Sequence, residues 1–186
     1  GDAIPAVELN ISCPNVDGDG MAWGISPESA AKAVSIARNE WSGALWVKLT
    51  PQSPDFEEVA KAAEGAGADA LVCGNTWLGM AMDVKKKRPA FQRVFAGLSG
   101  PAVFPLALRT VWQAAGAVSI PIVGCGGVAR WEDAVAMILA GASAVEVGSA
   151  LFTDFDLPRK ITEGLAGYLA DEGLAGPASL AGLGRK

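Results

Sequence analysis

Short apolar runs alternate with amphipathic segments along most of the 186-residue chain. The apolar runs are predicted to be strands, and they cover residues 7–12, 45–49, 70–73, 121–123 and 144–147. The amphipathic segments are predicted to be helices over 27–40, 55–66, 101–116, 131–140 and 157–171, with 74–100 as a long loop. Because strands that alternate with helices form a parallel sheet with helices outside it, the sequence predicts an α/β fold.

The apolar strands, whose ends are marked by glycine, resemble barrel strands more than those of a doubly wound sheet. Gly-Ala-Asp at 67–69 and Gly-Ala-Ser at 141–143 each come directly before a predicted strand, as a repeated βα unit would give. A TIM (β/α)₈ barrel typically needs about 250 residues. Five strands therefore predict an incomplete barrel, lacking its N-terminal βα units and keeping about strands 4 to 8, with residues 1–186 as one domain. The tail from Gly173 is expected to fold back on the barrel.

Charge and hydropathy exclude several classes of partner. Twenty acidic residues against fifteen basic ones give a net charge of −5, which argues against nucleic acid as a ligand. The basic run at 85–88 is interpreted as a solvated loop face, with a partner patch as the alternative. No apolar run approaches the roughly 20 residues that a membrane span needs.

Cysteine and histidine usage restricts the chemistry. Cys13, Cys73 and Cys125 are odd in number and contain no CxxC pair, which argues against a disulfide framework or a zinc site. Cysteines without a disulfide framework predict a reducing compartment, the cytoplasm. The chain has no histidine, which excludes Ser-His-Asp and Cys-His catalysis. Proton transfer must therefore use Cys, Lys, Asp, Glu or Tyr.

Polar groups close the first predicted strand. Asn10 and Ser12 share a strand parity and are expected to point to one face, and Cys13 and Asn15 follow at a proline turn. The carboxyl ends of barrel strands are where catalytic groups lie. This set suits a small polar substrate, although a cysteine buried as a small apolar residue is the competing interpretation.

A lysine near the end of the second predicted strand needs a partner, because burying a lone ammonium is costly. Lys48 is expected to face an electron-rich ring that gains negative charge on reduction. The alternative is an ion pair with a barrel acid such as Glu8 or Glu146.

Glycines follow the later strands. Gly74-Asn75-Thr76 follows the third predicted strand, and the side chains of Asn75 and Thr76 can form hydrogen bonds with amide or carbonyl groups of a ligand. The segments 124–128 and 147–150 follow the last two strands, where barrels often hold a phosphate against glycine N–H groups. Tight-turn glycines are the alternative. A further cluster at 97–101 precedes a helix.

Six segments occur together in one order: ELNISCPN, VKLTP, GNT, GLSGPA, GCGGV and VGSA. In this order and spacing, from about Val7 to Phe152, the chain resembles the dihydroorotate dehydrogenases. The cysteine of the first segment marks class 1 of that family. The stretch GLSGPAVFPLALR is most similar to its B subtype.

The resemblance implies FMN-dependent oxidation of (S)-dihydroorotate to orotate in de novo synthesis of UMP. It implies that Cys13 is the base that removes the C5 proton while the C6 hydride passes to FMN. The implied cofactor contacts are Asn10, Lys48, Gly74, Gly100, Gly126, Gly127, Gly148 and Ser149. The implied substrate contacts are Asn10, Asn15, Asn75 and Thr76.

The resemblance also implies what this chain lacks. Relatives often have a β-branched residue at position 74, so glycine there is expected to loosen packing under the flavin. Their N-terminal part supplies a substrate lysine and an Asn-rich loop, so this chain alone is expected to be inactive. B-subtype relatives pass electrons to a separate subunit with FAD and an iron–sulfur cluster, and then to NAD. A homodimer or heterotetramer is expected at full length.

Two other functions fit part of the pattern. The pyrimidine-reducing domain of a dihydropyrimidine dehydrogenase shares the cysteine and the flavin barrel, but the Cys-Pro-Asn turn and the long loop fit it less well. A non-catalytic phosphate-binding half barrel would keep the glycine clusters without needing Cys13, Asn10, Asn15 and Lys48 together.

Overall fold

A computed structural model describes residues 4–12 and 22–186 of the chain. Its centre is a five-stranded sheet in which every neighbouring pair is parallel, in the order β1-β2-β3-β8-β9. The strands are β1 (Ala6–Asn10), β2 (Ala44–Leu49), β3 (Ala70–Cys73), β8 (Ile122–Cys125) and β9 (Ala144–Glu146). This arrangement confirms the predicted α/β fold with five parallel strands.

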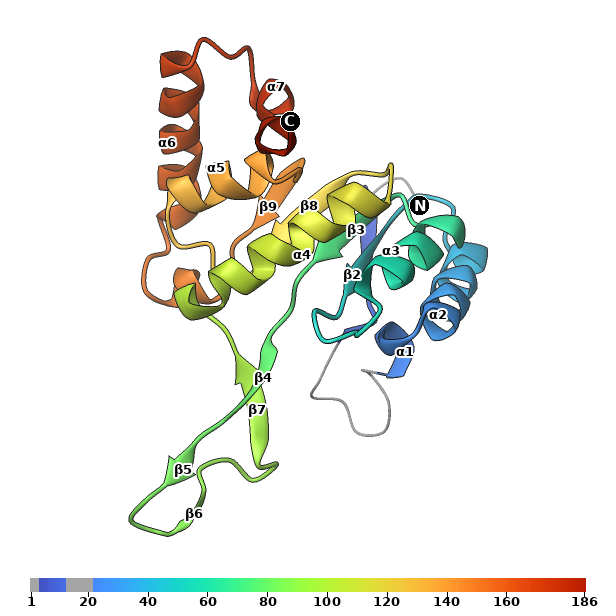
Figure 1. The fold of residues 1–186 in the computed structure, drawn as a ribbon, viewed down its shortest axis with the longest axis vertical. Coiled ribbons are helices and arrows are strands. Elements are labelled where there is room, and N and C mark those ends of the chain that lie inside the picture. Colours follow the sequence, from blue (N-terminus) through green and yellow to red (C-terminus); the bar gives the residue numbers. More distant parts are fainter. Residues whose placement is uncertain (1–3, 13–21) are drawn as a thin grey trace.

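Helices connect the strands and lie outside the sheet (Figure 1). The α-helices are α1 (Ala22–Ile25), α2 (Pro27–Glu40), α3 (Phe56–Gly65), α4 (Phe104–Ala117), α5 (Trp131–Leu139), α6 (Leu157–Asp171) and α7 (Pro177–Leu180). Short 3₁₀ turns are η1 (Pro101–Val103), η2 (Ser149–Phe152) and η3 (Leu183–Arg185). Helix α2 begins as predicted, because the Ser26 hydroxyl accepts the Ser29 N–H at 3.3 Å and proline occupies the first helical position. None of the helices within the described residues is both long and apolar enough to cross a membrane.

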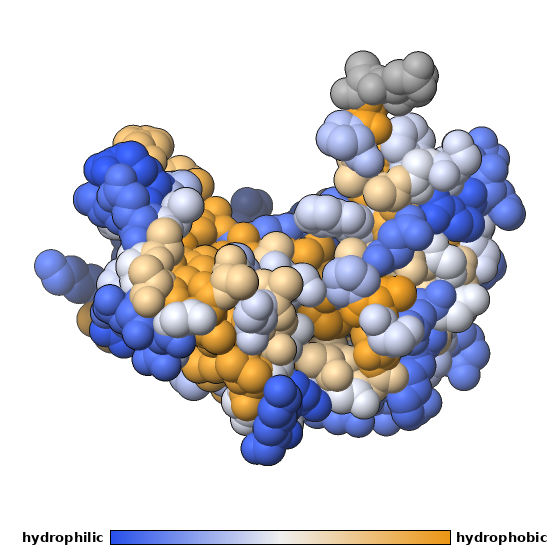
Figure 2. Space-filling view, turned by 90° about the horizontal axis from the view of Figure 1, so that it is seen from above, coloured by the Kyte–Doolittle hydropathy of each residue, from blue (hydrophilic) through white to orange (hydrophobic). Residues whose placement is uncertain are grey.

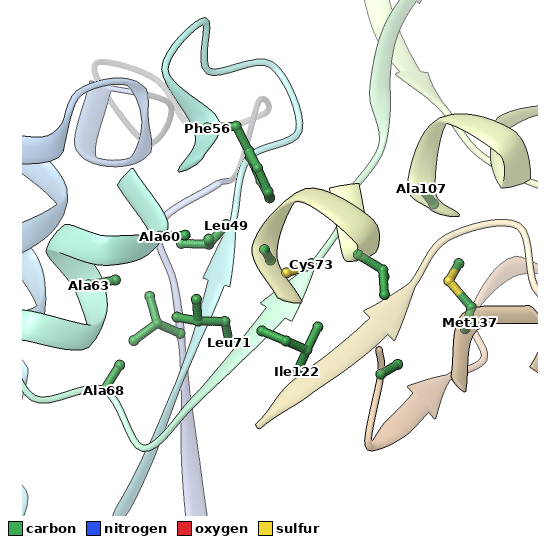
Figure 3. Packing of buried hydrophobic residues seen from close by; sticks show 14 of the residues in the cluster. Leu49, Phe56, Ala60, Ala63, Ala68, Leu71, Cys73, Ala107, Ile122 and Met137 are labelled. Atoms are coloured by element: carbon green, nitrogen blue, oxygen red, sulfur yellow. The ribbon is translucent and has the colours of Figure 1, made fainter. Parts of the chain in front are cut away.

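The main core lies between the sheet and these helices. In β2, Leu45, Val47 and Leu49 are fully buried against the helices, whereas Trp46 and Lys48 point to the opposite face. Figure 3 shows side chains of β2, β3 and β8 packed together with small alanines of α3. Burying each such leucine stabilises the fold by about 1.5–3 kcal/mol. The face away from the helices is therefore left for polar groups.

The segment predicted as one long loop instead contains two antiparallel strand pairs. β4 (Trp77–Met80) pairs with β7 (Phe95–Leu98), and β5 (Met82–Asp83) pairs with β6 (Arg88–Pro89). We call residues 77–98 the arm, which projects from the sheet in Figure 1. Local sequence did not reveal it because these short strands pair across up to twenty intervening residues. The basic run at its tip, 85–88, is exposed, as the solvated-face interpretation predicts.

The C-terminal tail folds back, as predicted, onto α4 and α5. Leu180 is 1% exposed and packs in a small cluster with Val135 and Ile138 of α5. The Gly182 N–H donates to the Ile138 carbonyl at 2.9 Å. The guanidinium of Arg185 donates to the carbonyl oxygens of residues 112 and 140, at 2.7 and 3.2 Å. These contacts hold the C-terminal tail against α4 and α5.

Candidate active site

A pocket of about 580 Å³ lies at the carboxyl ends of the parallel strands. Its lining residues are Lys48, Asn75, Thr76, Ser99, Val103, Cys125, Gly126, Gly127, Gly148, Ser149, Leu151, Phe152 and Phe155. They come from β2, from the end of β8, from the segments that follow β3, β8 and β9, and from residues 99–103 directly before α4. A ligand pocket of this size at this edge of the sheet is the usual place for a barrel active site.

Lys48 is ion-paired on the inner face of the sheet. Its Nζ lies 2.7 Å from Oε2 of Glu146 and 3.3 Å from Oε1 of Glu8. Both contacts were the alternative that the sequence left open for this lysine. The pairing does not remove Lys48 from the pocket, since it still lines the cavity.

Burial and charge shift the pKa values of this cluster. Burial is the largest single effect on the pKa of Lys48 and lowers it, but the hydrogen bond to Glu146 and the nearby negative charges together outweigh burial and raise that pKa to about 12. The pKa of Glu8 is raised, mainly because burial disfavours its charged form and because it shares a hydrogen bond with Glu146. Burial opposes ionisation of Glu146 too, yet its hydrogen bonds to Lys48 and Glu8, together with the charge of Lys48, hold its pKa below the usual value. The cluster therefore keeps the ammonium charged and ionises Glu146 more readily than Glu8.

The two described cysteines are poor bases. Burial raises the pKa of the Cys125 thiol to about 11, although Lys48 opposes this shift. Cys73 is fully buried, and its thiol pKa is raised further by the same cause. Neither thiol is appreciably ionised at neutral pH.

Two carboxamides and a hydroxyl form a hydrogen-bonded row beside the pocket. Oδ1 of Asn10 accepts the Ser12 N–H at 3.0 Å and the Ser12 hydroxyl at 2.9 Å. Nδ2 of Asn75 donates to the Ser12 hydroxyl oxygen, and Oδ1 of Asn75 accepts the Thr76 N–H at 2.8 Å. Oγ1 of Thr76 is buried and has no partner among the described residues. The row connects β1 to the end of β3.

The glycine turn after β8 approaches the start of α4 closely. Gly126 and Gly127 have φ values of 125° and 76°, which side-chain-bearing residues rarely adopt. A Cβ at Gly127 would lie 2.7 Å from the backbone nitrogen of Phe104, and one at Gly126 would lie 2.9 Å from Cβ of Ala107. A Cβ at Gly148 would meet no atom within 4 Å. The backbone here forms a cradle beside a helix N-terminus, a shape and charge that fit a phosphate.

Gly74 lies where the ends of two strands approach each other closely. A Cβ in its conformation, with φ of 133°, would lie 1.9 Å from the carbonyl oxygen of Cys125. Glycine therefore allows the end of β3 and the end of β8 to approach more closely than a β-branched residue would permit in this conformation. The expected loosening of packing under the flavin stays a prediction.

The structure brings most of the predicted site residues to one pocket. Those that line it are Lys48, Asn75, Thr76, Gly126, Gly127, Gly148 and Ser149. Gly74 and Gly100 are the chain neighbours of lining residues, and Asn10 reaches Asn75 through Ser12. Cys13 and Asn15 lie outside the described residues. The cofactor and substrate roles of all these residues stay predictions.

Sequence reasoning did not assign the apolar part of the lining to the site. Val103 is the last residue of η1, directly before α4, and Leu151, Phe152 and Phe155 follow the last glycine cluster. Phe152 and Phe155 are each 86% exposed. Large apolar residues directly after a phosphate-type glycine turn were the available signal. Among the described residues, no group of His, Cys, Asp and Glu is arranged to hold a metal ion.

Comparison with known proteins gives one family. A family model described as dihydroorotate dehydrogenase matches residues 2–169. A protein of Bacteroides thetaiotaomicron named dihydroorotate dehydrogenase B (NAD(+)), catalytic subunit, is 49% identical over 172 residues, which are 92% of this chain and 57% of that protein. A protein of the same name from Trichlorobacter lovleyi is 48% identical over 184 residues, which are 97% of this chain and 60% of that protein. The chain thus spans about three fifths of the length of these relatives.

A solved structure shares the fold. The crystal structure of DHODH in complex with ferulenol from Eimeria tenella superposes with a TM-score of 0.83, covering 98% of this chain and 54% of that chain. The sequence identity is 22%, so this likeness shows the fold alone. Together with the parallel sheet, it assigns the chain to the α/β architecture of TIM-barrel type.

Proposed function

The chain belongs to the dihydroorotate dehydrogenase family, and on that premise we propose that the whole protein oxidises (S)-dihydroorotate to orotate in de novo synthesis of UMP. The observation that carries the proposal is a single pocket at the carboxyl ends of the strands. It combines a charged lysine, the carboxamide of Asn75 beside Thr76, and a glycine cradle. A small polar substrate and a phosphate-bearing cofactor each find a fitting part of this pocket.

FMN is the cofactor that the residues fit. Gly126, Gly127, Gly148 and Ser149 would hold its phosphate, because they line the pocket and the turn after β8 lies against the start of α4. Asn10, Lys48, Gly74 and Gly100 would lie along the remainder of the cofactor. When bound, FMN would supply the acceptor for the substrate hydride. Lys48 would keep its positive charge throughout the physiological pH range, since its pKa is raised to about 12.

Cys13 is the proposed base for the C5 proton of dihydroorotate. The two described thiols support this assignment by exclusion, because burial raises the pKa of both well above neutrality. A free thiol has a pKa near about 8.5 and can accept a proton at neutral pH far more readily than a serine hydroxyl. Asn75 and Thr76, with Asn10 and Asn15, are proposed to hold the orotate ring and its carboxylate.

The proposal extends to the rest of the protein. We propose that these 186 residues are the C-terminal part of one FMN-binding (β/α)₈ domain and supply about strands 4 to 8. The relatives are named as NAD(+)-linked B-type catalytic subunits, which supports electron transfer to NAD through a separate subunit carrying FAD and an iron–sulfur cluster. We also propose that the full-length protein forms a homodimer or heterotetramer in the cytoplasm.

Anaerobic reduction of the purified full-length protein tests the function. Dihydroorotate is expected to bleach the oxidised flavin band, and orotate should be the product. Dihydrouracil, the substrate of the dihydropyrimidine alternative, should not bleach it. Reduction by dihydrouracil but not by dihydroorotate would replace the proposal with that alternative. A protein that binds phosphate but no flavin would favour the non-catalytic half barrel.

A further inference from the structure

Ser12 occupies a central position between the two carboxamides that the proposed function assigns to the substrate. It lies two residues after the end of β1, is 1% exposed, and its one hydroxyl forms hydrogen bonds with Asn10 on one side and Asn75 on the other. A carboxamide can present either its oxygen or its NH₂ group to a ligand, depending on which way it is turned. The hydrogen bonds on its protein side decide between these two orientations.

Two backbone N–H groups show which way both amides are turned. The Ser12 N–H can only donate, so the Asn10 atom that it meets at 3.0 Å must be the oxygen. The Thr76 N–H can only donate, so the Asn75 atom that it meets at 2.8 Å must also be the oxygen. The Ser12 hydroxyl matches both assignments, since it donates its single proton to Asn10 and accepts from Nδ2 of Asn75.

This arrangement leaves hydrogen-bond donors for a ligand. Within residues 4–12 and 22–186, Nδ2 of Asn10 forms no hydrogen bond, and Nδ2 of Asn75 has one of its two protons committed to Ser12. Oδ1 of Asn10 already accepts two hydrogen bonds from the protein, and Oδ1 of Asn75 accepts one. The remaining N–H groups of these amides therefore favour acceptor atoms of a ligand, such as carboxylate or ring carbonyl oxygens.

We infer that Ser12 is a positioning residue that holds Asn10 and Asn75 with their NH₂ groups toward the ligand, and that it thereby makes the site selective for a ligand edge of acceptor oxygens. The inference rests on the proposed function for the identity of that ligand. It goes beyond that function in assigning to Ser12 the discrimination between acceptor and donor groups. Without the hydroxyl, each amide loses one of the contacts that oppose its rotation.

The test compares pairs of ligands in the full-length protein with FMN bound. Orotate is paired with orotamide, which carries a carboxamide in place of the carboxylate, and with the analogue whose C4 carbonyl oxygen is replaced by an amino group. Dissociation constants come from the change in flavin absorbance on binding. In Ser12→Ala, orotate should bind about tenfold more weakly, as expected for loss of hydrogen bonds in a buried network. The preference for orotate over at least one analogue should fall by about fivefold or more.

Two further variants separate positioning from loss of structure. Ser12→Thr keeps the hydroxyl and should keep the preference. Ser53→Ala removes another buried serine hydroxyl, which donates to the Ile25 carbonyl at 3.0 Å, and should leave both affinities and the preference unchanged. If Ser12→Ala weakens all ligands equally, the inference is overturned. If the unaltered protein binds neither FMN nor orotate, the proposed function itself is wrong, which is a different outcome from an error about Ser12.

Discussion

Lys48 and Glu146 form a 2.7 Å ion pair although two strands, β3 and β8, separate their own strands in the sheet. In a flat sheet, β2 and β9 would lie about 14 Å apart, at about 4.8 Å per strand. The short contact shows that the inner face is concave, as in a barrel wall. The same curvature brings the end of β2 and the turns after β8 and β9 to one pocket.

Removing the cation from this cluster should destabilise the protein in a pH-dependent way. Lys48→Met in the full-length protein leaves Glu8 and Glu146 facing each other without compensation. We expect a loss of about 1–3 kcal/mol at pH 8, below the range for a fully buried pair because both carboxylates keep contact with water. The loss should be smaller near pH 5, since Glu8, whose pKa is already raised, then takes up a proton. Urea denaturation at both pH values measures this.

The direction in which stability changes with pH follows from the groups of the unaltered protein. The pKa of Glu146 is lowered in the folded state, so its stabilising contribution is present above its ordinary value of 4.5 and is lost as the pH falls through the lowered value. Lys61→Met, which removes an exposed pair with Glu58, is the matched control and should leave the urea midpoint nearly unchanged. Equal losses for Lys48→Met at pH 5 and pH 8 would contradict the assigned charges.

Replacing the proposed base should slow chemistry without releasing the cofactor. Cys13→Ser in the full-length protein is expected to slow anaerobic flavin reduction by dihydroorotate by about 10²–10⁴-fold at neutral pH. FMN content should be unchanged, because the glycine cradle is untouched. Cys73→Ala, at a fully buried thiol outside the pocket lining, is the control and should keep the rate while lowering the melting temperature. Full activity of Cys13→Ser at pH 7 would remove Cys13 from its proposed role.

A methyl group in the cradle should disturb the cofactor site. In Gly127→Ala the new Cβ would lie 2.7 Å from the Phe104 nitrogen, at a φ of 76° that costs about 1–2 kcal/mol for alanine. We expect FMN to bind at least about tenfold more weakly, as measured by flavin fluorescence on dilution. Gly167→Ala, in α6 with no atom near the added Cβ, should instead stabilise the helix by about 0.5–1 kcal/mol. Unchanged FMN affinity in Gly127→Ala would place the phosphate elsewhere.

The 186-residue chain alone is expected not to be a stable monomer with bound FMN. In the described sheet β1 pairs only with β2 and β9 only with β8, which leaves two open edges that invite pairing with another chain. Figure 2 shows apolar surface in a hollow between polar margins, and Phe152 and Phe155 are each 86% exposed. Size-exclusion chromatography with detection at flavin wavelengths should show aggregates or self-association. A yellow monomer that oxidises dihydroorotate would refute this expectation.

Local patterns predicted the sheet strands and helices well. The strand predicted over 45–49 lies within β2, and the helix predicted over 27–40 coincides with α2. The arm was missed because its strands are two to four residues long and find partners far along the chain. Strand pairing of this kind depends on distant contacts more than on local preference.

The sequence by itself determined the order of strands and helices, the shared parity of Asn10 and Ser12, and the glycines that follow the last strands. These features depend on residue type and on spacings of a few residues, which the chain carries locally. The partner of Lys48, the close approach of Gly74 to the Cys125 carbonyl, and the joining of Asn10 to Asn75 by Ser12 were decided only by the tertiary structure. Each joins strands distant in the chain, and only the curvature and register of the assembled sheet set those distances.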